Sequence, residues 1–332
     1  MRAVIAKDFG SLDKLTLEEV RDPTPGVGEI LVDVCAVGVN FSDLLVIDGK
    51  YQNLPTPPFV PGKVVSGVVA ELGCGCARFE PGDRVMALLD DGAYAERAVA
   101  NQGTAFTIPD GMSHVQAASM GTAYQTAHFA LIERGQYRAG ETVLINGATG
   151  GVGLAALQLA KFKEATVLAG LTSPEKAATA RANGADYVID LSGENLADSL
   201  RRQVRDLTEG RGVDIVLDPI GGEVFEASLR ALAWRGRAVI IGFASGRIPT
   251  IKANYLLLKN ISVNGLYRSS YWQRDPEWVR RVQDEIFALF AARRINPPIM
   301  RTFALEDFRD ALSLITERKV LGRVVLTTGR GA

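Results

Sequence analysis

The sequence predicts an α/β protein of two domains: a β-rich domain and a doubly wound domain with a six-stranded parallel sheet. The chain has 332 residues, which is long for one domain and sufficient for two. Residues 1 to about 120 alternate short β-branched runs with glycine and proline, whereas residues 123–265 alternate strand-like and helix-like runs. Repeated strand–helix units pair their strands in parallel through right-handed crossovers, which predicts the second domain.

The first domain shows strand patterns separated by turn signals. The strand-like runs are "KLTLEEV", "EILVDVCAV", "KVVSGVVAEL", "PGDRVMALL" and "AYAERAVA", and the turns include "DPTPGVG", "PTPPFVPG" and "FEPGDR". No long helical pattern precedes Ser113. This part of the chain is therefore expected to be built mainly of strands.

The second domain begins with "TVLING" and continues through "ATVLAGL", "DYVIDL", "DIVLDPIGG", "RAVIIGF" and "NISVNGL". After "ATVLAGL", Ser173 suits a helix N-cap, Pro174 the first turn and Gly184 the helix end. The tail predicts a long helix beginning near Asp275 and Pro276, a shorter one in "LEDFRDALSLI" and a strand in "GRVVLTT". We expect this tail to return to the first domain.

Composition excludes several classes of protein. The 37 basic and 38 acidic side chains leave the chain near neutrality, with no basic stripe that would predict nucleic-acid binding. No apolar run approaches the ~18 residues that a membrane span requires. Lys7 and Asp8 interrupt the N-terminal stretch where a signal peptide has its apolar core, so a cytoplasmic location is expected.

Cysteine and histidine give little indication of a metal. Cys74 and Cys76 form a Cys-x-Cys pair that can hold a metal, but no second Cys or His pair is nearby, which favours two loop cysteines. Cys35 lies inside a strand pattern and is expected to be buried. The two histidines, His114 and His128, are more typical of structural residues than of ligands.

The segment "INGATGGVGLAALQLAK" places four glycines between a strand and a helix. In a dinucleotide-binding βαβ unit, glycines form the turn, admit the pyrophosphate and let the helix pack on the strand. The helix N-terminus then offers free N–H groups to the phosphates. The alternative is a glycine-rich turn without a ligand. The predicted binding residues are Gly147, Ala148, Gly150, Gly151, Val152 and Gly153.

The end of the next strand favours NADP(H) over NAD(H). An NAD site usually has an acidic residue there for the ribose hydroxyls. This chain has Thr172 and Ser173 instead, and Lys176 follows one turn into the next helix. Small hydroxyls and a lysine accommodate a 2′-phosphate, although Lys176 is also compatible with a solvated helix position.

Ordered motifs along the chain resemble one family. "VNFSDLLVIDGKYQNLP", "FVPGKVVSGVV", "FEPGDRVMAL", "GAYAE", "NGATGGVGLAALQLAK", "GADYVID", "GVDIVLDPIGG" and "ANYLLLKNISVNG" are similar to the zinc-independent medium-chain dehydrogenases/reductases, above all the zeta-crystallin-like quinone oxidoreductases. The resemblance implies a GroES-like catalytic domain from residues 1–122 and 266–332 and an inserted Rossmann domain at 123–265. It also implies a homodimer paired through the strand around "NISVNGL".

The metal ligands of the zinc-dependent members are absent. Those enzymes carry a Cys at the position of Asn40 and Gly-His-Glu where this chain reads Gly62-Lys63-Val64. Their four-cysteine lobe is also missing, so no metal is predicted. Without a Lewis acid to lower the pKa of an alcohol, alcohol oxidation is disfavoured.

The resemblance implies an active-site loop containing Asn40, Asp43 and Tyr51. Reduction of an electron-poor double bond by NADPH develops charge on a carbonyl oxygen, which requires a hydrogen-bond donor. Asn40 can donate its amide to substrate or cofactor, and Tyr51 can bind the oxygen or donate a proton. Asp43 is expected to orient these groups, and the alternative is a helix-capping or buried structural carboxylate.

Matching motifs add further cofactor contacts and some departures. Thr122 is expected near the nicotinamide, and Phe243 has the alternative of plain core. Some relatives have a Tyr at the position of Leu191 that helps to hold the 2′-phosphate, which this chain lacks. Relatives with Tyr and Arg at the positions of Leu45 and Ile47 have a more polar pocket, whereas the pocket wall here is expected to be apolar. The added cofactor contacts are Thr122, Gly242, Phe243 and Leu266.

Three functions remain open. The first is NADPH-dependent, metal-free reduction of a quinone or another α,β-unsaturated carbonyl. The second is reduction of a 2-enoyl thioester, for which "GKY" supplies the tyrosine and Lys50, Lys63, Arg268 and Arg274 supply nearby positive charge. The third, from another class, is an NADPH-binding sensor or structural protein.

Overall fold

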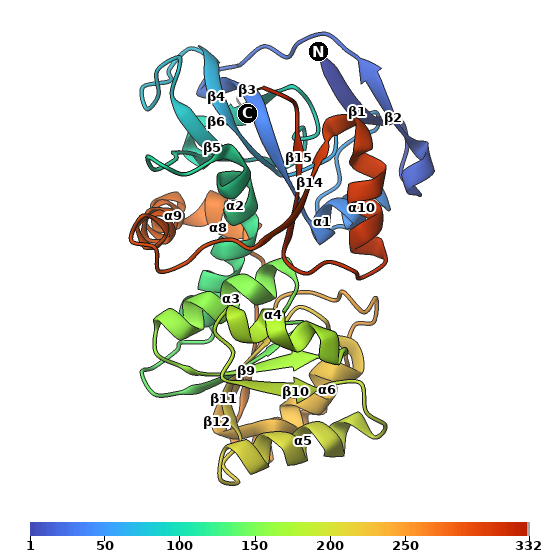
Figure 1. Cartoon of the computed structure of the whole chain (residues 1–332), viewed down its shortest axis with the longest axis vertical. Coiled ribbons are helices and arrows are strands. Elements are labelled where there is room, and N and C mark those ends of the chain that lie inside the picture. Colours follow the sequence, from blue (N-terminus) through green and yellow to red (C-terminus); the bar gives the residue numbers. More distant parts are fainter. Residues whose placement is uncertain (331–332) are drawn as a thin grey trace. The chain divides into compact units, whose positions relative to one another are not determined.

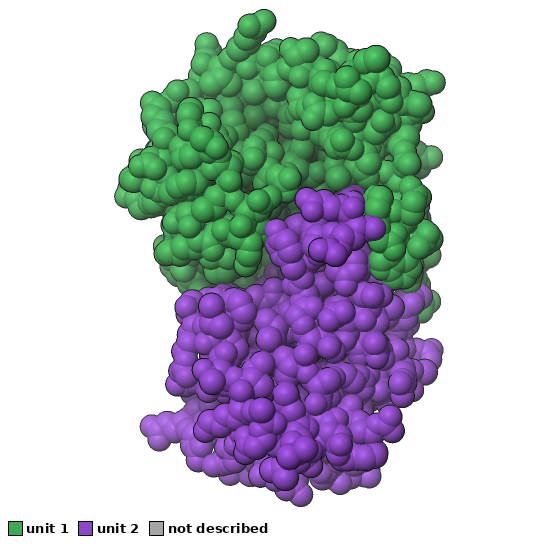
Figure 2. Space-filling view, turned by 180° about the vertical axis from the view of Figure 1, so that it is seen from behind, with its two compact units in different colours: residues 1–122, 275–332 green, residues 123–274 purple. Residues whose placement is uncertain are grey.

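The computed structural model describes residues 1–330 and divides the chain into two compact units (Figure 2). Unit 1 comprises residues 1–122 and 275–332, and unit 2 comprises residues 123–274. Unit 2 extends beyond the expected Rossmann boundary at 265 because the short helix α8 (Ser269–Arg274) belongs to it. The last two residues of the expected catalytic range 266–332 lie outside the described part.

Unit 2 contains a six-stranded sheet in which every pairing is parallel, which confirms the predicted doubly wound sheet. The strand order is β10-β9-β8-β11-β12-β13, so the chain starts in the middle, builds one half outward and then returns to build the other. The topological switch therefore falls between β8 and β11. The strands are β8 (Thr142–Asn146), β9 (Thr166–Leu171), β10 (Tyr187–Asp190), β11 (Val213–Asp218), β12 (Leu232–Ile240) and β13 (Ser262–Gly265).

Helices cover both faces of this sheet (Figure 1). The helices α3 (Gly151–Phe162) and α4 (Ala177–Ala182) lie on one side, and α5 (Leu196–Leu207) and α6 (Gly222–Ala231) on the other. On the α5–α6 side, Leu200, Val204 and Phe225 belong to one buried cluster with strand residues. The sequence analysis did not predict α7 (Ala253–Lys259), α8, or the π-helical turn η3 (Phe129–Arg134) that continues α2 (His114–His128).

Unit 1 is built mainly of strands, and its longest sheet has the order β14-β15-β3-β4-β5-β7, with β6 also paired to β3. The C-terminal β15 runs antiparallel to β3 in the register Val324↔Val39 and Leu326↔Val37, so the end of the chain completes this sheet. The strands of unit 1 are β1 (Arg2–Ala6), β2 (Leu15–Glu19), β3 (Glu29–Val39), β4 (Val64–Leu72), β5 (Arg84–Leu88), β6 (Arg97–Asn101), β7 (Ala105–Thr107), β14 (Ile299–Ala304) and β15 (Arg323–Thr327).

The helices of unit 1 follow the signals in the sequence. No long helix precedes α2, because α1 (Phe41–Ile47) has only 7 residues. The long helix α9 (Pro276–Ala291) begins where Asp275 accepts a hydrogen bond from the Trp278 N–H at 3.0 Å, with Pro276 in the first turn. The shorter α10 (Phe308–Thr316) packs through Phe308 and Leu312 into the core of unit 1.

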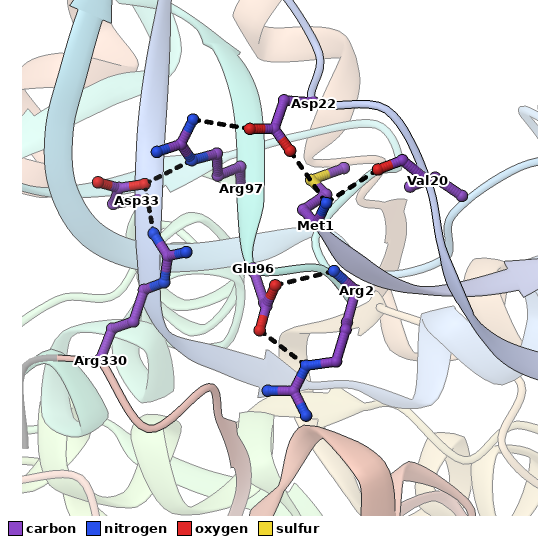
Figure 3. A network of polar contacts seen from close by, with 8 residues as sticks. All are labelled: Met1, Arg2, Val20, Asp22, Asp33, Glu96, Arg97 and Arg330. Atoms are coloured by element: carbon purple, nitrogen blue, oxygen red, sulfur yellow. Dashed lines mark hydrogen bonds and ion pairs between the residues drawn. The ribbon is translucent and has the colours of Figure 1, made fainter.

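An ion-pair network joins distant parts of unit 1 (Figure 3). The Arg97 side chain lies between two carboxylates, 2.8 Å from Asp33 and 2.8 Å from Asp22. Arg330, near the end of the chain, also contacts Asp33 at 2.7 Å. These contacts connect β3, β6 and the C-terminal segment, and their partial exposure makes each of them individually weak.

Candidate functional site

The predicted cofactor residues of unit 2 lie mostly at one edge of its sheet. Gly147 follows β8, Thr172 follows β9, Gly242 follows β12 and Leu266 follows β13. Because all six strands are parallel, their carboxyl ends meet at the same edge. Ligands of open α/β sheets bind at this edge, beside the switch between β8 and β11.

The glycine-rich turn of residues 147–153, here called the glycine corner, packs the start of α3 closely against the turn after β8. Gly147 has φ +61°, and a Cβ added to Gly153 would lie 2.3 Å from the Gly147 carbonyl oxygen, so the helix starts directly against the turn. No side chain caps α3 at Gly150, and the first-turn N–H groups of a helix lack intrahelical acceptors. These residues fit a bound dinucleotide phosphate. Ala148 is fully buried, whereas Val152 is half-buried at the helix start.

A buried polar bridge spans the switch point, and the sequence analysis did not identify it. The Asn146 side-chain amide at the end of β8 donates to Asp218 at the end of β11, with 2.6 Å between Nδ2 and Oδ2. The other Asp218 oxygen accepts from the N–H groups of Ile220 and Gly221 at 2.8 and 2.6 Å. Burial raises the pKa of Asp218, and these donors oppose that shift. The bridge holds the loop after β11 in place beside the predicted cofactor edge.

The segment after β9 contains an acidic neighbour that the sequence analysis did not weigh. The Ser173 hydroxyl donates to the carboxylate of Glu175, and Thr172 is exposed. Lys176 is half-buried at the end of the 3₁₀ turn η4 (Pro174–Lys176). A 2′-phosphate at this position would compete with Glu175 for Ser173. Leu191, which cannot replace the tyrosine of some relatives, is part of the core.

The other predicted cofactor contacts, Phe243, Leu266 and Thr122, differ in their burial and in the unit to which they belong. Phe243 is half-buried and is not part of the fully buried core, and Leu266 is half-buried beside β12, where its N–H donates to the Ile240 carbonyl. Thr122, in α2, belongs to unit 1. Its hydroxyl oxygen is buried and has no hydrogen-bond partner within residues 1–330, so it is available to a polar ligand group.

Asn40 is the centre of a buried polar cluster in unit 1. It lies between β3 and α1 and is 6% exposed. Its Nδ2 donates to the Gly38 carbonyl at 2.8 Å, and its Oδ1 accepts from Arg323 Nη2 at 2.9 Å. These contacts fix the orientation of the amide and occupy one of its two N–H groups. The second N–H is the donor that a substrate oxygen or cofactor can use.

Asp43 is a fully buried carboxyl group in the first turn of α1. Its Oδ2 accepts from the Asn40 backbone N–H at 2.9 Å and from the Tyr94 hydroxyl at 3.1 Å, whereas Oδ1 has no hydrogen-bond partner in the described residues. Burial raises the pKa of Asp43 to about 6, against the hydrogen bonds and the charges of Lys63 and Arg323. The helix-capping alternative therefore describes part of its role, because it fixes the start of α1.

Tyr94 reaches this carboxyl group because its neighbour is a glycine. Gly62 has φ +96°, and a Cβ at this position would lie 2.2 Å from the Tyr94 ring. Tyr94 is itself fully buried, and burial, reinforced by Asp43, raises the pKa of its phenol well above the usual value. Gly62 thus permits the contact that supports Asp43.

Tyr51 lies in the loop after α1 and packs against the core of unit 1. The Lys63 ammonium lies 4.7 Å from the centroid of its ring. Lys63 is 6% exposed and donates to the Asp90 carbonyl at 2.6 Å. Asn40 and Asp43 are thus hydrogen-bonded to each other, and Lys63 lies over the Tyr51 ring while its charge acts on Asp43.

Arg323 and Tyr94 were not among the site residues predicted from the sequence. Arg323 lies 283 positions from Asn40 in the chain, so no local sequence pattern could predict the hydrogen bond between them. The "GAYAE" motif contained Tyr94, but only as part of the resemblance. No sequence signal indicated the contact of Arg323, because its burial at the start of the last strand is known only from the structure.

Other polar features are remote from these groups or are structural. A hollow of about 480 Å³ on α5 is lined by Asp198, Arg201, Arg202, Arg205, Asp206 and Gly210. It runs along α5 from Asp198 in the first turn to Gly210 beyond the end of the helix. Within residues 1–330, no three His, Cys, Asp or Glu side chains are grouped to hold a metal. No helix in that range is long and apolar enough to cross a bilayer.

Comparisons with known proteins agree with this architecture. The family described as "Alcohol dehydrogenase GroES-like domain" matches residues 26–122, and the family described as "Zinc-binding dehydrogenase" matches residues 151–284. The quinone oxidoreductase-like protein 2 homolog of Nematostella vectensis is 35% identical over 333 residues, covering 98% of this chain and 89% of the relative.

Two solved structures are similar over nearly the whole chain. The quinone oxidoreductase of Pseudomonas syringae is 30% identical with a TM-score of 0.91, covering 98% of this chain and 99% of that chain. A mycobacterial protein complexed with NADPH is 32% identical with a TM-score of 0.92, covering 98% of this chain and 100% of that chain.

The fold and the matches define a two-domain protein with a GroES-like unit and a Rossmann-type unit. The chain belongs to the zinc-independent, quinone oxidoreductase-like family of the medium-chain dehydrogenases/reductases. The resemblance stated from the motifs is confirmed.

Proposed function

We propose that the protein uses NADPH to reduce quinones or other electron-poor α,β-unsaturated carbonyls by hydride transfer without a metal. The observation that carries this proposal is the fixed Asn40 amide, which keeps one N–H donor for an oxygen that gains charge. The names of the relatives support an oxidoreductase acting on quinone-like acceptors.

NADPH is the proposed cofactor, and unit 2 provides its binding residues. The pyrophosphate would bind at Gly150, Gly151 and the start of α3, and the 2′-phosphate would bind near Ser173 and Lys176. A similar mycobacterial protein was solved with NADPH, which supports this choice. When bound, NADPH supplies the hydride, and the protein contributes orientation and electrostatics.

The residues of unit 1 have distinct proposed roles. Asn40 donates a hydrogen bond to the acceptor's oxygen, and Tyr51 gives the proton that completes the reduction. Asp43 touches neither reactant in this scheme but holds Asn40 through its backbone N–H. Arg323 orients the Asn40 amide from the other side. In this scheme Asn40 and Tyr51 meet the charge that develops at the acceptor, and Asp43 and Arg323 hold Asn40 in position.

The decisive experiment is steady-state NADPH oxidation by the purified, metal-stripped protein with a quinone, a simple enone and a 2-enoyl-CoA supplied in parallel. Preferential turnover of the quinone or enone supports the proposal. Preferential turnover of the thioester would transfer the assignment to enoyl-thioester reduction. NADPH binding without turnover of any acceptor would indicate the sensor or structural alternative.

The cofactor choice has its own test. Lys176→Ala is expected to raise the KM for NADPH about tenfold while leaving the KM for NADH nearly unchanged, because only NADPH carries the 2′-phosphate. Glu175→Gln is expected to lower the KM for NADPH, since it removes the carboxylate that engages Ser173. Equal effects on both cofactors would contradict this placement of the phosphate.

We also propose a homodimer paired through β13. This strand is the last in the sheet of unit 2, and the nearby Leu257, Leu258 and Trp234 are 78%, 73% and 68% exposed. An exposed strand edge beside large apolar side chains favours association. The double variant Leu257→Lys/Leu258→Lys should sediment as a monomer, whereas Val27→Lys, at an equally exposed position of unit 1, should not change the mass.

A further inference from the structure

Lys63 is a buried lysine whose position is set by rigid structure. It directly precedes β4, and its carbonyl accepts from the Leu89 N–H at 2.9 Å. Its side chain is 6% exposed, and the ammonium donates to the Asp90 carbonyl at 2.6 Å. A lysine is rarely buried to this extent without a charged or polar environment that compensates for the loss of hydration.

The ammonium lies over the face of Tyr51, 4.7 Å from the ring centroid. The face of a phenol ring is electron-rich, so the cation attracts and orients it. Tyr51 itself belongs to the loop that follows α1, where the backbone is not held by a strand or a helix. A residue anchored beside a strand thus holds a loop tyrosine in one orientation.

The positive charge of Lys63 also opposes the rise in pKa of two acidic groups, Asp91 and Asp43. Burial raises the pKa of Asp91, and Lys63 opposes that shift. Lys63 acts in the same direction on Asp43 in α1. The charged groups that lie near the Lys63–Tyr51 pair include Asp43, Asp90, Asp91, Arg323 beside Asn40, and Lys50, which pairs with Asp48.

We propose that Lys63 is a positioning residue for the proton donor Tyr51: its ammonium fixes the phenol ring and stabilises negative charge on the phenol oxygen. This inference rests on the proposed reductase function. After hydride transfer, the Tyr51 O–H bond breaks, the proton forms a new bond to the reduced acceptor, and the electron pair remains on Tyr51 as tyrosinate. A hydrated proton from bulk solvent then reprotonates the tyrosinate, so each cycle consumes one H⁺ together with the hydride. The cation favours the charged intermediate form of the tyrosine.

The test compares Lys63→Met with Lys63→Arg in the full-length protein. Met retains much of the side-chain volume and removes the charge, and the Asp90 carbonyl belongs to an exposed residue that water can reach. Lys14→Met is the control for the loss of a lysine that donates to a backbone carbonyl, because the half-exposed Lys14 ammonium donates to that of Phe9 at 2.8 Å. Thermal unfolding of each variant verifies that the fold is retained.

Two measurements distinguish positioning from simple structural support. The first is the ultraviolet titration of Tyr51, taken as the difference between each protein and its Tyr51→Phe counterpart, which needs no substrate. The second is the pH profile of kcat with NADPH and the best acceptor. Lys63→Met should move Tyr51 ionisation to higher pH and lower kcat about tenfold, with little change in the KM for NADPH. Lys63→Arg should restore most of both.

The results separate this inference from the proposed function. If the wild-type protein reduces an acceptor but Tyr51 ionises at the same pH in the wild type and in Lys63→Met, the role of Lys63 is overturned and the reductase assignment stands. If Tyr51 ionisation shifts as expected but no acceptor is reduced, the reductase assignment fails while the coupling of Lys63 to Tyr51 stands. In Tyr51→Phe, Lys63→Met should cause no further loss of kcat.

Discussion

The ionisation of Asp43 should make stability depend on pH in a way that one substitution can isolate. Its pKa is raised from 3.8 to about 6 because the carboxyl group is fully buried. In the unfolded chain the group ionises near the ordinary value, whereas in the folded chain it stays protonated until about pH 6. Asp43 therefore contributes stability below about pH 4 that is lost as the pH rises through about 6.

The magnitude follows from the size of the shift. A difference of about two pKa units corresponds to roughly 3 kcal/mol of folding free energy. Asp43→Asn places a neutral group of the same shape at this position. Its oxygen can accept from the Asn40 N–H and the Tyr94 hydroxyl, as Oδ2 of Asp43 does. The variant should consequently gain about 3 kcal/mol relative to the wild type between pH 4 and pH 7.5.

Urea denaturation followed by circular dichroism at several pH values measures this difference directly. Comparison of variant and wild type at each pH cancels the other titrating groups. Tyr94→Phe provides a second variant, because it keeps the carboxyl group but removes one of its donors, so the loss of stability on raising the pH should increase. A constant difference between Asp43→Asn and the wild type from pH 4 to pH 7.5 would refute the reasoning.

Three further substitutions test other parts of the molecule. Gly153→Ala places a Cβ 2.3 Å from the Gly147 carbonyl oxygen, so the variant should lose about 1–3 kcal/mol of stability. It should also bind NADPH more weakly in a fluorescence titration. The control Gly193→Ala, whose Cβ would meet only Ser199 Oγ at 3.6 Å, should be neutral. Arg323→Met releases the Asn40 amide and should lower kcat at least tenfold with a small change in the KM for NADPH; equal changes in both constants would indicate a general loss of structure. Asp33→Asn removes the carboxylate that Arg97 and Arg330 share, and Arg97 keeps only Asp22. The loss should be about 1 kcal/mol in urea denaturation and smaller in 1 M salt; a salt-independent loss would point to packing instead.

Local pattern was sufficient to predict the architecture. The alternation of strand and helix signals predicted the six parallel strands of unit 2, because a crossover helix between consecutive strands enforces parallel pairing. Capping signals predicted the start of α9, where Asp275 accepts from the Trp278 N–H. Short elements were less predictable: α7 and the π-helical turn after α2 have no strong periodic signal and depend on the packing around them.

The glycine corner was also predictable, because turn, phosphate approach and helix start all depend on residues close together in the chain. Gly147 lies in the turn before α3 and Gly153 in the first turn of that helix. A Cβ on Gly153 would lie 2.3 Å from the Gly147 carbonyl oxygen, so the structure requires a small residue there. The roles assigned there to cofactor-binding residues stay predictions until binding is measured.

The sequence by itself determined the class of fold and the family, and it predicted that the segment 40–51 carries the catalytic residues. Only the tertiary structure showed what surrounds that segment: Arg323 from the last strand, Tyr94 admitted by Gly62, and Lys63 over the Tyr51 ring. Periodicity and capping arise from neighbours a few residues apart. A buried charge is stabilised by groups that can be far apart in the chain, as Arg323 and Asn40 are. Such a contact cannot be predicted from a local sequence pattern.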